Sequence, residues 1–166
     1  EYKGAEEYRQ FMQEQLFNHI NIDLAATNVP DGKRDDSEHV CEEYEEMIAK
    51  LGGIDIQLLG LGHNGHIGFN EPADEFPVKT HCVALQESTI EANKRFYDSA
   101  DDVPRFAYTM GIGTIMKAAK ILVVASGSDK AGILKKACTG PVVPKVPASI
   151  LGLHKDVTII GDEGSF

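Results

Sequence analysis

Cysteine is scarce in this chain, which has 3 in 166 residues. Cys41, Cys82 and Cys138 form no C-x-x-C pair, so the sequence indicates neither a disulfide framework nor a zinc knuckle. Unpaired cysteines are typical of a reducing compartment, and we expect a cytoplasmic protein. Long apolar runs are also lacking, and none approaches the length that spans a bilayer. No signal peptide is visible, and we expect no membrane partner.

Positive charge is in short supply, with 16 Lys and Arg against 26 Asp and Glu and a net charge of −10. This balance argues against a large nucleic-acid surface, because binding to phosphates along a strand needs a basic face. It leaves room for a small anionic substrate, which needs only a few local cations. The length fits one domain with a real core, and the 42% apolar and 25% charged residues are ordinary for a globular protein.

The stretch from Leu61 to Pro72 concentrates the groups that could do chemistry. Its twelve residues include two histidines, two asparagines, one glutamate and three glycines. It follows the apolar run 54–60, which predicts a buried strand of a parallel sheet. In an open α/β sheet, ligands bind just beyond the carboxyl ends of the strands. The sequence therefore predicts an active site in this loop.

Apolar periodicity and turn residues predict strands that alternate with helices, which indicates βαβ units and a mainly parallel sheet. We expect helices over 5–20 and from 36 or 37 to 51, with a possible short strand before the turn at 30–32. Glu42, Glu43, Glu45 and Glu46 predict a solvated acidic face on the second helix. The remaining elements are strands at 80–85, 107–110, 120–125 and 156–160, and helices at 87–96, just after 111–114 and from about 130 to 138.

His66 is the first catalytic candidate, because its ordinary pKa of about 6.5 lets it accept or donate a proton near neutral pH. Glu71 lies five residues on, and Asn64 could hydrogen-bond the imidazole and fix its tautomer. The alternative is a loop histidine that bonds to the backbone. His63, His66 and Glu71 also suggest a metal set, but the histidines are not spaced i, i+4 on a helix, so we predict no metal.

Two further segments could bind an anion. Ser126-Gly-Ser-Asp-Lys130 is a strand-to-helix turn, and the N–H groups at a helix N-terminus attract phosphate. Arg95 closes a predicted helix. The alternatives are a simple helix cap with an exposed Lys130, and an Arg95 that only complements the helix dipole.

These segments together resemble a known family, the glucosamine-6-phosphate deaminases. The likeness covers the whole chain, and its most specific part is the string Gly65-His-Ile-Gly-Phe-Asn-Glu-Pro72. It continues through the segments 92–96, 109–114, 126–130 and 146–150. The related 6-phosphogluconolactonases share the fold and a Gly-His loop, but they lack the Phe-Asn-Glu-Pro continuation.

The resemblance implies an α/β fold, a Rossmann-like three-layer sandwich with a mainly parallel sheet. It implies an enzyme that converts glucosamine 6-phosphate to fructose 6-phosphate and ammonia in amino-sugar catabolism, without a cofactor. His66 would be the ring-opening base, assisted by Asn64 and Glu71. The implied substrate-binding residues are Arg95, Lys130, Gly65 and Asn70, with the first two holding the phosphate.

The chain departs from the family pattern in three places that matter. One is Gly4-Ala5, which joins two stretches that family members separate by several more residues. The family's enolisation base is an aspartate directly before a Glu-Tyr pair, and here Glu1-Tyr2 begins the chain. We therefore expect residues 1–166 to form a single α/β domain that is the C-terminal part of a longer catalytic domain. Many members carry aspartate where Asn64 stands. Asp74, His81 and Val83 occupy positions that bind an effector phosphate in the allosteric, hexameric branch, which argues against the same activation by N-acetylglucosamine 6-phosphate. We expect a monomer or small homo-oligomer.

Two other functions remain open at this point. One is a hydrolase similar to the 6-phosphogluconolactonases. The other is a non-catalytic regulator that binds a sugar phosphate through Arg95 and Lys130 on the same scaffold.

Overall fold

The structure, a computed structural model, divides into two compact units, and each is described by itself. The first unit comprises residues 1–44 and 82–108, and the second comprises 45–81 and 109–166. The residues that the structure describes are 4–85, 87, 90–91, 94, 99 and 103–166.

A three-stranded parallel sheet forms the centre of the second unit. Its strands are β1 (Ile56–Gly60), β4 (Lys120–Ala125) and β5 (Val157–Gly161), in the order β1-β4-β5. Leu58 pairs with Leu122 across the first ladder, and Leu122 pairs with Thr158 across the second. The three strands and their parallel pairing confirm the prediction from the sequence.

The two faces of this sheet differ because side chains alternate along a strand. Leu59, Ile121 and Val123 point into the core and are at most 5% exposed. Ile56 and Leu58, on the other face of β1, are 63% and 62% exposed. The apolar run at 54–60 therefore forms a strand of the parallel sheet, as predicted, with alternate side chains buried.

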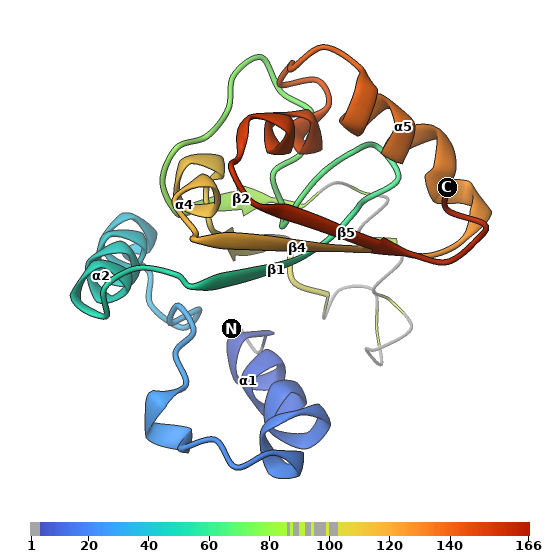
Figure 1. Cartoon of the computed structure of the whole chain (residues 1–166). Helices are drawn as coiled ribbons and strands as arrows, with labels where there is room; N and C mark the ends of the chain where they lie inside the picture. The colour runs from blue at the N-terminus through green and yellow to red at the C-terminus, as the bar shows by residue number, and fades with distance from the viewer. Residues whose placement is uncertain (1–3, 86, 88–89, 92–93, 95–98, 100–102) are drawn as a thin grey trace. The chain divides into compact units, whose positions relative to one another are not determined.

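Helices cover the buried face of the sheet, on the side where Figure 1 shows α5 and the coil of η6. Ile115 from α4 (Ile112–Met116), Leu134 from α5 (Ala131–Thr139) and Leu151 from η6 (Pro147–Leu153) share one core cluster with the strands. The 3₁₀ turn η5 (Ser128–Lys130) runs directly into α5. A parallel sheet with flanking helices is a Rossmann-like α/β architecture, as the sequence predicted.

The first unit contains helical elements and most of a second, two-stranded sheet. They are α1 (Gly4–Gln15), the 3₁₀ turns η1 (Phe17–His19) and η2 (Leu24–Ala26), and most of the strands β2 (His81–Ala84) and β3 (Phe106–Thr109). The first helix ends earlier than predicted, and residues 21–36 contain no strand. The strands β2 and β3 form a separate two-stranded sheet, so their predicted place in the parallel sheet was wrong. The predicted helix at 87–96 falls largely outside the described residues.

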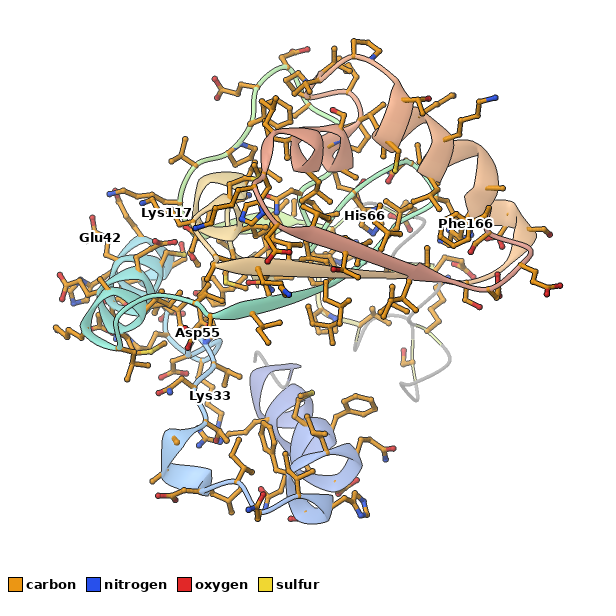
Figure 2. The ribbon with its side chains drawn as sticks, in the orientation of Figure 1. Lys33, Glu42, Asp55, His66, Lys117 and Phe166 are labelled. Carbon is orange, nitrogen blue, oxygen red and sulfur yellow. The ribbon has the colours of Figure 1, made fainter. Side chains whose placement is uncertain are left out.

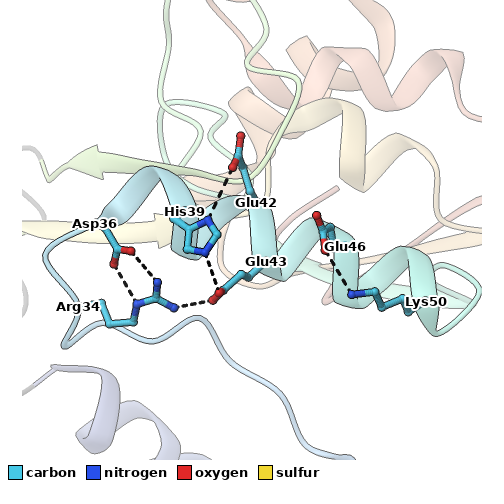
Figure 3. Close-up of polar contacts among 7 residues, drawn as sticks. All are labelled: Arg34, Asp36, His39, Glu42, Glu43, Glu46 and Lys50. Atoms are coloured by element: carbon cyan, nitrogen blue, oxygen red, sulfur yellow. Dashed lines mark hydrogen bonds and ion pairs between the residues drawn. The ribbon is translucent and has the colours of Figure 1, made fainter.

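Helix α2 (Ser37–Lys50) ends one residue earlier than the sequence predicted, and Figure 3 shows its Glu42, Glu43 and Glu46. Glu43 pairs with Arg34 and His39, and Glu46 pairs with Lys50, all near the surface. The prediction of a solvated face is wrong for one member of the row, because Glu45 is half-buried.

Glu45 accepts three hydrogen bonds through one carboxylate oxygen. The donors are the backbone N–H of Thr80 (2.7 Å), the Thr80 hydroxyl (2.6 Å) and the Thr114 hydroxyl (2.6 Å). Burial raises the pKa of this carboxyl, but the three hydrogen bonds outweigh burial and hold the pKa below its ordinary value. Glu45 therefore ties the end of α2 to α4 and to the segment that precedes β2.

Candidate active site

Three loops meet at one edge of the parallel sheet, because each follows the carboxyl end of one of its neighbouring strands. The loop 61–72 follows β1, the turn 126–130 follows β4, and the segment 162–166 follows β5. Figure 2 shows His66 in the first of these loops, on the side of the sheet where α5 lies. The predicted loop thus stands where an open α/β sheet binds its ligands.

Buried residues of the loop 61–72 anchor it to the rest of the second unit. Ile67 is 0% exposed and Asn70 is 1% exposed. The Asn70 side-chain amide donates to the backbone carbonyls of Ile67 (2.9 Å) and Met110 (2.8 Å). Gly65 has φ +86°, and its carbonyl accepts a hydrogen bond from the N–H of Ala148. These bonds hold the exposed middle of the loop, which carries the polar side chains.

His66, Asn64 and Glu71 form a connected group. Nδ1 of His66 lies 2.8 Å from Oδ1 of Asn64, and the Asn64 amide nitrogen donates to Oε2 of Glu71 at 2.5 Å. Since Oδ1 of an amide only accepts, Nδ1 of His66 carries the hydrogen, and Nε2 keeps its lone pair in the neutral ring. Oε1 of Glu71 lies 3.5 Å from Nδ1 of His66. The group therefore presents a base at Nε2.

The imidazole of His66 lies against Gly62. A Cβ at position 62 would overlap with Cε1, Nδ1 and Nε2 of the ring, at separations inside the 3.0 Å that real Cβ contacts essentially never reach. The N–H of Gly62 also donates to the carbonyl of His66 at 2.9 Å. A glycine at this position therefore makes room for the ring.

The pKa of His66 lies below its ordinary value. Partial burial is the main cause, the charge of Glu71 acts in the opposite direction, and the positive charges of Lys130 and His63 lower it further. The His66 side chain nevertheless keeps 30% of its surface exposed, so a ligand can reach it. The ring is thus neutral near pH 7 and able to accept a proton.

The turn 126–130 is anchored by Asp162. The Asp162 carboxylate accepts hydrogen bonds from the Ser126 hydroxyl at 2.6 Å and from the N–H of Gly127 at 2.9 and 3.1 Å. These bonds hold the pKa of Asp162 below its ordinary value. Lys130 stands at the start of α5, as predicted, and its charge acts on His66. Within the part of the chain that the structure describes, its ammonium makes no hydrogen bond or ion pair.

A pair that sequence reasoning missed joins the two loops. Nε2 of His63 lies 2.5 Å from Oδ2 of Asp129, 66 residues further along the chain. The His63 and Asp129 side chains are 74% and 55% exposed. The sequence offered no signal for this contact, because it depends on β1 and β4 being neighbours.

Of the other predicted substrate-binding residues, Arg95 is outside the described residues, and Gly65 and Asn70 are buried. The predicted site of Arg95 with Lys130 therefore stays a prediction. Because Gly65 and Asn70 support the loop, a substrate contact would need them to become exposed. Among the described residues, no group of three His, Cys, Asp or Glu side chains could hold a metal ion.

Comparisons with known proteins show the family to which this chain is similar. The model of the family described as glucosamine-6-phosphate isomerases/6-phosphogluconolactonase matches residues 3–160. The glucosamine-6-phosphate deaminases of Lachnoclostridium phytofermentans and Clostridium perfringens are each 56% identical to this chain. The alignments cover 96% and 94% of the chain and 70% and 64% of those proteins.

A solved structure is similar as well. The structure of a monomeric glucosamine-6-phosphate deaminase has a TM-score of 0.89 and 44% sequence identity, and the match covers 95% of this chain and 66% of that one. These matches confirm the predicted fold class. The family match and the fold define a sugar-phosphate isomerase-like α/β protein. The chain belongs to the glucosamine-6-phosphate isomerase/6-phosphogluconolactonase family, and it spans about two-thirds of the length of its relatives.

Proposed function

We propose that the protein converts glucosamine 6-phosphate to fructose 6-phosphate and ammonia, an amino-sugar-degrading reaction of the deaminase branch of its family. The observation that carries this proposal is the His66–Asn64–Glu71 group, which leaves a basic Nε2 on a ring that also feels the positive charge of Lys130. Relatives that are 56% identical are glucosamine-6-phosphate deaminases, which supports the same reaction here.

His66 opens the sugar ring in this proposal. Nε2 takes the proton of the anomeric hydroxyl, the C1–O5 bond breaks as the C1 carbonyl forms, and the same proton returns to the ring oxygen. One imidazole can serve both steps if it faces both oxygens. The hydrogen bond from Nδ1 to Asn64 keeps the ring in the required tautomer and orientation.

Asn64 and Glu71 act on the basicity of His66 from the Nδ1 side of its ring. The Asn64 amide gives orientation without charge, and Glu71 supplies a negative field from 3.5 Å. A carboxylate in direct contact with Nδ1 would favour the imidazolium more strongly than this arrangement does. The pair is thus suited to keep His66 neutral before each turnover.

Lys130 binds the substrate phosphate. Its ammonium is unpaired among the described residues and stands at the N-terminal end of α5, where the helix dipole also favours an anion. We propose that Arg95 joins it there. A phosphate held at this point would fix the sugar while its other end reaches the imidazole of His66.

The isomerisation also needs a base at the carbon that bears the amino group. The residues around His66 are assigned here to ring opening alone. Because the chain spans about two-thirds of the length of its relatives, the experiment uses protein expressed from the full coding sequence.

Two assays of that protein test the function. We expect release of ammonia from glucosamine 6-phosphate, measured with an enzyme-coupled assay, and no hydrolysis of 6-phosphogluconolactone above the spontaneous rate. Lactone hydrolysis without ammonia release would assign the chain to the other branch of its family. Binding of glucosamine 6-phosphate without turnover of either compound would indicate a sugar-phosphate-binding regulator.

Assembly and location are proposals of the same kind. We propose a monomer or small homo-oligomer, supported by the likeness to a monomeric deaminase, and sedimentation velocity tests it. In the described residues, no helix has the length and apolar character needed to cross a membrane. We propose that the enzyme acts in the cytoplasm, since a charged phosphate ester does not enter the bilayer core unaided.

A further inference from the structure

An acidic residue stands directly beside the proposed phosphate-binding cation. Asp129 precedes Lys130 in the turn η5, which leads into α5. A carboxylate at an anion site is unfavourable in two ways: it repels the incoming phosphate, and it can pair with the neighbouring ammonium. Lys130 nevertheless has no side-chain partner among the described residues, so the position of the Asp129 carboxylate needs an explanation.

One oxygen of Asp129 has a hydrogen-bond partner, and the other lies close to the backbone of Gly127. Oδ2 lies 2.5 Å from Nε2 of His63. Oδ1 lies over Gly127, where it is 2.5 Å from the position that a Cβ would occupy. Gly127 has φ +98°, a backbone conformation that L residues rarely adopt, so a glycine here permits both the turn and the close approach of the carboxylate.

We propose that His63 is a positioning residue that holds Asp129 away from Lys130 and keeps the ammonium available to the phosphate of the substrate. The imidazole donates to the carboxylate through Nε2 and, when protonated, also compensates its charge. For the identity of the substrate, this inference rests on the proposed function. His63 itself does not contact the reacting atoms in this scheme.

A purely mechanical role is the main competitor. The His63–Asp129 pair joins the loop 61–72 to the turn 126–130, so it could act only as a tie between them. The two roles differ in what happens when both partners are removed. A tie is lost when His63 is removed and stays lost in the double variant. A shielding role is lost when His63 is removed, but becomes unnecessary once the charge of Asp129 is removed too.

The test measures Kd for glucosamine 6-phosphate by titration calorimetry, and for inorganic phosphate by NMR titration, in protein from the full coding sequence. We expect His63→Ala to raise both Kd values about two- to fivefold, the range that one exposed ion pair supports. Asp129→Asn should leave them unchanged or lower them. The double variant His63→Ala/Asp129→Asn should return to the wild-type values, with kcat close to the wild-type value.

Lys145→Ala is the matched control, because Lys145 and Asp74 form another exposed ion pair between distant segments, at 2.7 Å. It should leave both Kd values unchanged. An unaffected His63→Ala variant, or a double variant as weak as His63→Ala, would overturn the proposal. Failure of the proposed function is a separate result, in which the wild type binds glucosamine 6-phosphate but releases no ammonia, and the Kd series still decides the role of His63.

Discussion

Gly62→Ala is a precise test of how the loop positions its base. The added methyl group would overlap with three atoms of the His66 ring, while the backbone at this position needs no left-handed conformation. The substitution therefore perturbs the imidazole far more than the chain. The ring must retreat by about 1 Å to reach ordinary van der Waals separation, which breaks or weakens its 2.8 Å hydrogen bond to Asn64.

The expected loss of activity follows from that displacement. A misplacement of about 1 Å can cost on the order of 10²-fold in rate, and complete loss of a general base costs on the order of 10²–10⁴-fold. We expect kcat for ammonia release to fall by about 10²-fold in Gly62→Ala protein. The NMR signals of the His66 ring should move as well, while the free energy of unfolding changes by less than about 3 kcal/mol, the usual limit for overpacking.

Gly60→Ala provides the matched control, because Gly60 lies two residues earlier and a Cβ there meets nothing within 4 Å. This variant should keep near-normal kcat. The reasoning would be refuted if Gly62→Ala also kept normal turnover, or if both variants lost activity equally.

Three further changes test other parts of the site and the fold. Asn64→Asp places a carboxylate against Nδ1 of His66 and raises the pKa of the imidazole. The acidic limb of the kcat/KM profile is expected below pH 6.5 in the wild type and should move to higher pH in the variant. An unmoved limb contradicts the assignment of His66 as the base. Lys130→Ala should raise KM for glucosamine 6-phosphate more than it lowers kcat, since phosphate binding is mostly uniform binding, and the reverse split would exclude this role. Glu45→Ala should lower the free energy of unfolding in urea by about 2 kcal/mol, because it leaves buried donors unpaired, whereas the exposed Glu46→Ala should change it by less than about 0.5 kcal/mol. Equal losses of unfolding free energy in both variants at neutral pH would disprove this stabilising role of Glu45. Because folding lowers the pKa of Glu45, its contribution to stability is complete above the unfolded-state pKa and is lost as pH falls through the folded-state pKa.

Local patterns in the sequence predicted the features that depend on neighbouring residues. The strand at 120–125 and helix α2 could be placed because their apolar residues and capping positions lie within one element. The glycine-rich loop after β1 was placed correctly because a loop that follows a buried strand must emerge at the edge of the sheet. Asn64, His66 and Glu71 lie within eight residues, so one turn could bring them together.

Features that depend on distant contacts could not be predicted. Periodicity places a strand but not its partner, so the separate sheet of β2 and β3 was missed. Glu45 belongs to an acidic row, and only its contacts with Thr80 and Thr114 distinguish it from its exposed neighbours. The His63–Asp129 pair likewise follows from β1 and β4 being adjacent, which no local pattern encodes.

The most direct test of the central claim is ammonia release from saturating glucosamine 6-phosphate by the wild type and by His66→Ala. We expect turnover by the wild type, and a kcat on the order of 10²–10⁴-fold lower in the variant with a similar Kd for substrate. His39→Ala, which removes an exposed histidine paired with Glu43, should behave as the wild type. Near-normal turnover by His66→Ala, or no ammonia from the wild type, would contradict the claim.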